Sequence, residues 1–173
     1  MKRKLGLLLL ALVLIASSLA GCSQPKETGG DSGDGASGDV IKIGVFEPMT
    51  GANAAGGEMT VEGIELANET RGEVLGKKVE LVIVDNKSDK VEAANAVSRL
   101  IDKDKVVAII GSYGSSLSMA AGDIVKKAEV PAVGCSPTNP LVTLNNDYYF
   151  RVCFIDPFQG TVMANYAFND LKA

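Results

Sequence analysis

The sequence predicts an α/β fold: a parallel sheet that is doubly wound, with helices on both faces. From residue 40 onward, short apolar runs rich in β-branched residues alternate with amphipathic segments of helical length. Most of these apolar runs lead into turns rich in glycine, serine or proline. Strands separated by helices of this length pair in parallel through right-handed crossovers, and the sequence therefore predicts one layered sheet.

The first half of this region contains two strands and two helices. The helices are indicated by apolar residues spaced three to four apart, and Asp89 with Glu92 three residues later has the spacing of a capping box. In chain order we expect a strand at residues 40–46, a loop at 47–57, a helix from about 58 to 70, a strand at 78–85 and a helix from 90 to about 102.

A third strand, residues 106–110, leads into the turn Gly111-Ser112-Tyr113-Gly114-Ser115-Ser116 and then into a helix that ends near Ala128. In open α/β sheets, ligands bind beyond the carboxyl ends of the strands, where a helix start offers unpaired N–H groups to an anion. Ser115 and Ser116 add hydroxyl groups at the same point. We therefore expect this turn to hold the carboxylate of a small ligand.

The remaining elements are a strand at 129–134, a loop at 135–140 that contains two prolines, a strand at 148–152 and a helix from 156 to the end. Asp156 is expected to be the N-cap of this helix, with Pro157 at its first position. The helix reaches Ala173 without a stop signal, so we expect the chain to be cut short there.

The N-terminus has the pattern of an export signal. A basic segment, Lys2-Arg3-Lys4, precedes an apolar run from Leu7 to Ile15, and Leu19-Ala20-Gly21-Cys22 resembles the bacterial lipobox. We expect a lipoprotein signal peptide at 1–21 and a lipid anchor on Cys22 that holds the exported protein at the outer face of the membrane. The alternatives are an ordinary signal peptide with an incidental cysteine, or an uncleaved membrane anchor.

Residues 22–39 contain many glycine, serine and aspartate residues and almost no apolar ones, so we expect a flexible tether. Residues 40–173 then form the ligand-binding lobe. In an exported protein Cys135 and Cys153 can form a disulfide or remain two partly buried thiols, and the sequence leaves both possibilities open.

Composition excludes several classes of function. The formal net charge is −4, which argues against a nucleic-acid partner because phosphate binding needs basic patches. The chain has no histidine, so it has no Ser-His-Asp triad and no histidine-bound metal. We expect no catalytic residues, no metal site, no cofactor and therefore no enzyme.

The ordered motifs from Val40 to the C-terminus resemble the first lobe of the branched-chain amino acid binding proteins, the leucine/isoleucine/valine-type substrate-binding components of ABC transporters. The matching segments are Ile43-Gly44-Val45, Pro48-Met49-Thr50-Gly51, Gly111 to Ser116, Ser136-Pro137-Thr138-Asn139-Pro140, Phe150-Arg151, Asp156 and Gln159-Gly160. The resemblance implies a type I periplasmic-binding-protein fold, an amino acid ligand and the permease subunits of an ABC importer as partners.

The same resemblance implies a ligand site made of five residues. Ser115 would donate to the ligand's α-carboxylate, with Ser116 adjacent, Ser136 would offer backbone groups, and Thr138 its hydroxyl and N–H. Asp156 would face the α-ammonium directly or through water. The structural alternatives are a surface turn residue for Ser115, a turn residue for Thr138 and a helix N-cap for Asp156.

Two departures from the family pattern matter. An aromatic residue often follows the first strand and covers the ligand side chain, whereas this chain has Gly56 there. The family also closes two lobes around its ligand, and only the first is represented, so we expect weak binding by this lobe alone.

The sequence also bears on two alternative functions. A nucleotide-binding enzyme is disfavoured because residues 111–116 lack the G-x-G-x-x-G spacing and no P-loop lysine follows. A sensory receptor module remains the alternative, because the same lobe architecture can serve either role.

Overall fold

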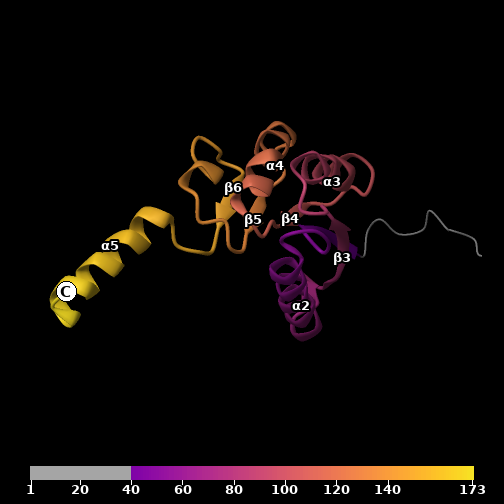
Figure 1. The fold of residues 1–173 in the computed structure, drawn as a ribbon. Coiled ribbons are helices and arrows are strands. Elements are labelled where there is room, and N and C mark those ends of the chain that lie inside the picture. Colours follow the sequence, from indigo (N-terminus) through magenta and orange to yellow (C-terminus); the bar gives the residue numbers. More distant parts are fainter. Residues whose placement is uncertain (1–39) are drawn as a thin grey trace, which may run out of the picture. The chain divides into compact units, whose positions relative to one another are not determined.

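The computed structural model describes residues 40–173; the predicted signal peptide, the tether and Cys22 lie outside the described residues. The strands are β1 (Val40–Glu47), β2 (Glu73–Val74), β3 (Lys77–Asp85), β4 (Ala108–Ile110), β5 (Ala132–Gly134) and β6 (Tyr149–Arg151). The helices are α2 (Ala54–Thr70), α3 (Lys90–Asp102), α4 (Ser115–Ala128) and α5 (Asp156–Tyr166). A 3₁₀ turn, η1 (Pro140–Val142), and a π-helical segment, η2 (Ala167–Leu171), complete the described elements (Figure 1).

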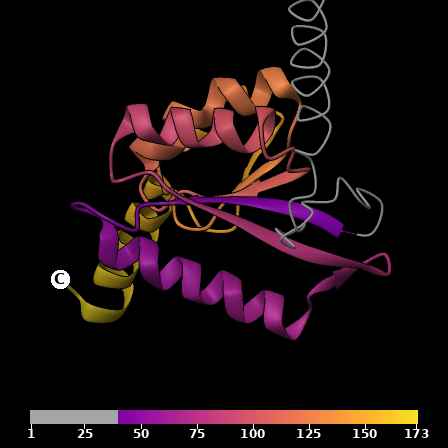
Figure 2. The same cartoon turned by 90° about the vertical axis from the view of Figure 1, so that its right-hand side faces the viewer.

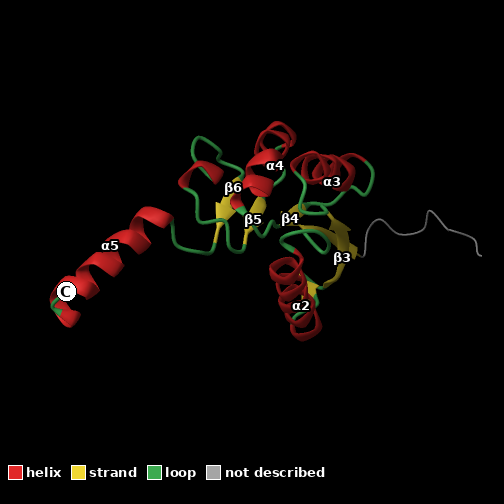
Figure 3. Ribbon diagram, in the orientation of Figure 1, coloured by secondary structure: helices red, strands yellow, loops and turns green. Residues whose placement is uncertain are grey.

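The strands form one six-stranded sheet in the order β2-β3-β1-β4-β5-β6. All neighbours pair in parallel except β2, which is antiparallel to β3. Helix α2 covers one face of the sheet, and α3 and α4 cover the other (Figure 2). The prediction of a doubly wound parallel sheet is confirmed, and the alternation of strand and helix is visible along the chain (Figure 3).

The main core lies between the sheet and the helices α3 and α4. Its largest members are Tyr149 from β6, Phe46 from β1, Leu100 from α3, Ile109 from β4 and Leu117 from α4, each with at most 1% of its surface exposed. Burial of such side chains contributes about 1.5–3 kcal/mol each to folding. This core fixes the start of α4 at the carboxyl edge of the sheet.

The helix α3 has the bounds that the sequence predicted. The carboxylate of Asp89 accepts hydrogen bonds from the N–H groups of Val91 and Glu92, at 2.7 and 3.0 Å, which confirms it as the N-cap. Glu92 pairs with Lys87 at 3.7 Å. The N-cap is confirmed, but the reciprocal bond of a capping box is not formed, because the N–H of Asp89 donates to the carbonyl of Asn86 at 3.0 Å.

Helix α2 begins at Ala54, four residues before the predicted start. The sequence placed Gly56 and Gly57 in a loop because glycine is a poor helix former. In the structure both N–H groups donate to the carbonyl of Asn53, at 3.2 and 3.1 Å, and both glycines are buried. Tertiary packing here overrides the local propensity.

The sequence analysis also missed β2 and overestimated three strands. The short strand β2 has only two residues, too few for a periodic signal. The observed β4, β5 and β6 have three residues each, shorter than the apolar runs that predicted them. Some flanking residues still form hydrogen bonds to the neighbouring strand, as Val107 N–H does to the carbonyl of Lys42 at 3.0 Å and Val152 N–H to that of Gly134 at 3.2 Å, but they lie outside the bounds of the strands.

Asp156 is the first residue of α5 and not its cap, so the N-cap prediction is wrong. The cap position is Ile155, and no side chain caps this helix. The helix begins one residue early because the N–H of Gln159 donates to the carbonyl of Ile155 at 3.2 Å. No residue of α5 is buried. Among residues 40–173, no helix has the length and apolarity needed to span a membrane.

Candidate functional site

The turn after β4 presents the start of α4 at the carboxyl edge of the sheet. Gly114 occupies the N-cap position with a φ of 96°, which favours glycine, and no side chain caps the helix. The carbonyl of Gly114 accepts from the N–H groups of Leu117 and Ser118, both at 3.2 Å. The first N–H groups of an α-helix have no partner within the helix, so this end can bind an anion.

The loop after β5 is held in place by the guanidinium of Arg151. Its Nη1 donates to the carbonyls of Pro137 and Asn139, at 2.7 and 2.8 Å. Its Nη2 donates to the carbonyl of Pro140 at 3.1 Å and to Oγ1 of Thr143 at 2.7 Å. A planar guanidinium with four bonds fixes the backbone of this loop on both sides of residue 138.

These two segments lie side by side. Oγ of Ser115 accepts a hydrogen bond from the N–H of Asn139 at 3.2 Å, which places the start of α4 next to Thr138. The carbonyl of Thr138 accepts from the N–H of Asp156 at 3.0 Å. These two hydrogen bonds therefore link three segments of the chain. Together the segments carry four of the five predicted site residues: Ser115, Ser116, Thr138 and Asp156.

Ser136 belongs to the same loop and has an unusual hydroxyl group. Its Oγ is shielded from solvent and has no hydrogen-bond partner among residues 40–173. Ser115, Ser116 and Thr138 are half-buried, whereas Asp156 is exposed at the beginning of α5. The site thus combines partly accessible hydroxyl groups with one exposed carboxylate.

A residue that the sequence analysis overlooked, Glu47, lies beneath the turn after β4. Its side chain is fully buried, and its Oε2 accepts from the N–H of Tyr113 at 2.6 Å. Oε1 has no hydrogen-bond partner in the described part of the chain. Burial raises the pKa of Glu47 from 4.5 to about 7, although the bond from Tyr113 opposes the shift. Its position at the end of a buried strand was the only sequence signal.

Two more buried polar residues support this turn and were also missed. The hydroxyl of Tyr149 donates to the carbonyl of Gly111 at 2.6 Å, and burial raises the pKa of this phenol above its usual range. The Nδ2 of Asn86 donates to Oγ of Ser112 at 2.9 Å. The turn is therefore held from β6 and from the end of β3, neither of which is near it in sequence.

Cys135 and Cys153 are both free and half-buried in the structure. Burial raises the pKa of the Cys135 thiol to about 11. Of the two possibilities that the sequence left open, the structure shows two thiols.

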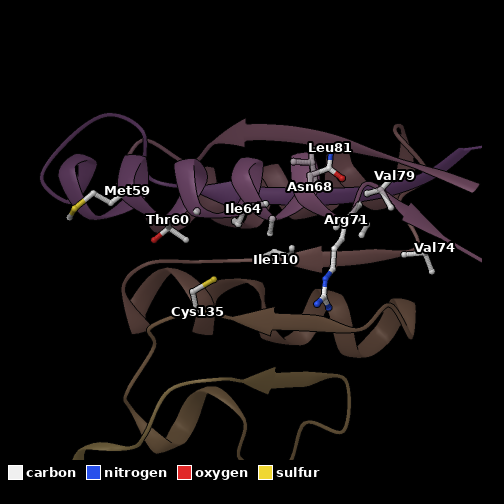
Figure 4. Close-up of a pocket in the computed structure, with 13 residues that line it drawn as sticks. Met59, Thr60, Ile64, Asn68, Arg71, Val74, Val79, Leu81, Ile110 and Cys135 are labelled. Atoms are coloured by element: carbon white, nitrogen blue, oxygen red, sulfur yellow. The ribbon is translucent and has the colours of Figure 1, made fainter.

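An apolar cavity of about 630 Å³ lies elsewhere, between α2 and the sheet. Met59, Thr60, Ile64 and Asn68 line it from α2, with Leu81 and Ile110 facing them from the sheet and Cys135 from the loop after β5 (Figure 4). None of the five predicted ligand residues is among its lining residues. Thr60, Asn68 and Arg71 are its polar lining residues, and no carboxylate is among them, so the cavity offers no partner of opposite charge to an amino acid's ammonium group.

Comparisons with known proteins agree with this architecture. The periplasmic binding protein family matches residues 40–173. An amino acid binding protein of Pseudomonas aeruginosa is 37% identical over 139 residues, which cover 78% of this chain and 37% of that protein.

Two solved structures are similar in fold and sequence. A leucine binding protein, LivK, of Thermotoga maritima has a TM-score of 0.73 and 51% identity, over 77% of this chain and 38% of that one. The substrate binding protein LivJ of a branched-chain amino acid transporter from Streptococcus pneumoniae, solved with isoleucine, has a TM-score of 0.72 and 36% identity, over 78% and 40%.

The chain thus spans less than half the length of the relatives that it matches. The family match nevertheless covers all of the described residues, and solved binding proteins share the fold with TM-scores of 0.73 and 0.72. On this evidence the chain belongs to the periplasmic binding protein family.

Proposed function

We propose that the chain is the extracytoplasmic solute-binding component of an ABC importer, which captures a small branched-chain or similar aliphatic amino acid and delivers it to a membrane permease. The observation that carries this proposal is the hydrogen bond between Ser115 Oγ and the N–H of Asn139. It places the uncapped start of α4 beside the loop after β5, and both segments carry donors suited to a carboxylate.

In this site the α-carboxylate binds at the start of α4. The free N–H groups and the partial positive charge of the helix end attract it, and the hydroxyls of Ser115 and Ser116 donate to it. A hydroxyl that accepts one hydrogen bond can still donate its own proton, so the bond from Asn139 leaves Ser115 able to act. Thr138 adds a hydroxyl and an N–H, and Ser136 adds backbone groups.

The α-ammonium faces Asp156, directly or through water. The N–H of Asp156 donates to the carbonyl of Thr138 at 3.0 Å, and this backbone contact between the two residues supports the proposed role of the Asp156 carboxylate. The partial positive charge at the start of α4 and the negative charge of Asp156 then fix the orientation of a zwitterionic ligand. Capture requires no chemistry, so the proposed role is binding and not catalysis.

Export and membrane attachment complete the proposal. Signal residues 1–21 direct export, and a lipid on Cys22 keeps the binding lobe close to its permease. Two or more acyl chains anchor a protein stably, and residues 22–39 act as a tether between anchor and lobe.

The test is an NMR titration, which detects weak binding. The ¹⁵N-labelled full chain in mild detergent is titrated with L-leucine, L-isoleucine and L-valine, with D-leucine and 3-methylbutylamine as controls. We expect chemical-shift changes at residues 115–117 and 136–139, much smaller with the amine because it lacks the carboxylate. Changes confined to the α2 cavity, around residues 63–68, or no changes with any L-amino acid, would contradict the proposal.

A further inference from the structure

A buried carboxyl group lies directly beneath the turn that leads into α4. The side chain of Glu47, the last residue of β1, has no exposed surface, and its Oε2 accepts a hydrogen bond from the N–H of Tyr113 at 2.6 Å. Its Oε1 is also shielded from solvent and has no hydrogen-bond partner among residues 40–173. Burial of an ionised carboxylate with one unsatisfied oxygen costs free energy, and protonation removes that cost.

No cation compensates the charge of this group in the part of the chain that the structure describes. The ion pairs there join Lys87 to Glu92 and Arg99 to Asp104, and neither includes Glu47. An ionised Glu47 therefore depends on the N–H of the turn above it, and its charge acts on whatever else approaches that turn.

The titratable groups that face Glu47 come from three other strands or their ends. Cys135 follows β5 and Tyr149 lies in β6, and burial together with the charge of Glu47 raises the pKa of both, so both stay neutral near pH 7. On β3 the register partner is Asp85, whose carboxylate accepts hydrogen bonds from the loop after β1. Asn86 adds a neutral amide. Near pH 7 the charge of this cluster therefore changes at Glu47.

The turn after β4 connects this carboxyl group to the proposed carboxylate site. Tyr113, whose N–H binds Glu47, precedes the N-cap residue Gly114, and Ser115 is the first residue of α4. Consecutive Cα atoms are about 3.8 Å apart, so residues 113 and 115 lie within about 8 Å of each other. A ligand carboxylate at Ser115 and an ionised Glu47 repel each other, and both draw on the same partial positive charge of the helix start.

We propose that Glu47 makes ligand binding dependent on pH: its carboxyl group takes up a proton from solvent when a ligand carboxylate binds at the start of α4, and its ionisation favours release. The inference rests on the proposed function, since it assumes an anionic group held at Ser115. A neutral Glu47 leaves the positive end of α4 to the ligand, whereas an ionised Glu47 competes for it. Affinity is therefore highest where Glu47 is protonated and falls as the pH rises through about 7.

The experiment compares affinities on either side of this titration. The dissociation constant of L-leucine is measured by NMR titration at about pH 5.5 and about pH 8.5 for the unsubstituted full chain, Glu47→Gln and Glu80→Gln. For the unsubstituted chain we expect a roughly tenfold larger value at the higher pH, from the repulsion of two charges about 10 Å apart. Glu47→Gln is always neutral and should keep the low-pH value at both. Glu80→Gln removes an exposed carboxylate of β3 and should behave as the unsubstituted chain does.

A second measurement needs no variant. The ¹³C chemical shift of the Glu47 carboxyl carbon is followed against pH, without ligand and with saturating L-leucine. Coupling is reciprocal, so a tenfold effect of the proton on leucine affinity requires leucine to raise the midpoint of this titration by about one pH unit. The control 3-methylbutylamine lacks the carboxylate and should leave the midpoint in place.

The outcomes separate this inference from the proposed function. If L-leucine binds equally well at both pH values, or leaves the Glu47 midpoint unchanged, the coupling is overturned and the proposed function stands. If Glu47→Gln loses affinity at high pH as the unsubstituted chain does, the assignment to Glu47 is overturned. If Glu47→Gln does not fold, the carbon titration of the unsubstituted chain decides. If no amino acid binds at either pH, both proposals are overturned.

Discussion

Oγ of Ser115 accepts a hydrogen bond from the N–H of Asn139 at 3.2 Å, across 24 positions in the sequence. The bond joins the first residue of α4 to the loop after β5, and it brings Ser115 beside Thr138. Had these two residues lain on opposite sides of the molecule, no shared ligand site could exist.

Replacing Ser115 by alanine should weaken the binding of L-leucine at least tenfold. The variant loses a hydrogen bond from a hydroxyl to a charged carboxylate, which contributes about 1.5–3 kcal/mol. NMR titration of the full chain measures the change. Ser98→Ala, a half-buried serine in α3, is the control and should bind leucine as the unsubstituted chain does. Equal affinities for Ser115→Ala and Ser98→Ala would exclude a role for Ser115 in binding.

Replacing Arg151 by lysine should destabilise the fold by roughly 2–3 kcal/mol, because an ammonium group cannot replace the four bonds of the guanidinium and leaves partly buried carbonyls without partners. Urea unfolding followed by circular dichroism measures this loss. The control is Arg99→Lys, since the side chain of Arg99 is 53% exposed and forms one ion pair, with Asp104 at 3.2 Å, and a pair with a solvated partner contributes about 1 kcal/mol or less. Similar losses for both variants would show that the Arg151 bonds are unimportant.

Replacing Glu47 by glutamine should change how stability depends on pH. The pKa of Glu47 is raised from 4.5 to about 7, so the folded state binds this proton more tightly than the unfolded state. Its stabilising contribution is complete below pH 4.5 and is lost as the pH rises to about 7. The loss is about 3 kcal/mol at 1.36 kcal/mol per unit.

Glu47→Gln stays neutral, so its stability relative to the unsubstituted chain should increase between pH 4.5 and 7. Urea unfolding at several pH values within this range measures the difference. Glu80→Gln, at an exposed position of β3, controls for the loss of one acidic group. A difference for Glu47→Gln that does not vary with pH would show that this carboxyl group titrates normally.

Replacing Cys22 by serine should abolish lipid attachment, because the thioether to the diacylglyceryl group requires the cysteine sulfur. Labelling of bacterial cells with radioactive palmitate, followed by membrane fractionation, measures the effect. Cys135→Ser should still incorporate the label, since Cys135 lies in the folded lobe. Palmitate incorporation by Cys22→Ser would refute the proposed anchor.

Much of the fold could be predicted because its signals are local. Asp89 caps α3 as its spacing to Glu92 indicated, and the bounds of α3 agree with its apolar periodicity. Helix α2 could not be bounded in this way, since Gly56 and Gly57 are unfavourable in a helix and are accommodated by contacts with Tyr113 and Pro48. Tyr113 is distant in the sequence and Pro48 lies in a loop, so the apolar periodicity of α2 gives no sign of these contacts.

The residues of the candidate site also divide into those with a local sequence signal and those whose role depends on packing between distant segments. The order of the motifs indicated Ser115 and Thr138, and the structure places their segments side by side. The supporting residues Glu47 and Arg151 were not identified as such, because a charged residue in a sequence gives no sign of whether it is solvated or buried.

The sequence by itself determined the alternation of strands and helices, the parallel pairing and the turns at which ligand groups are expected, because periodicity, capping and turn composition act over a few residues. Only the tertiary structure decided that Glu47 is buried beneath Tyr113, 66 positions away, and that the ring of Tyr113 rests on Gly56. Such relationships depend on which strands become neighbours, and packing across the sheet sets both the titration of a carboxyl group and the position of an aromatic ring.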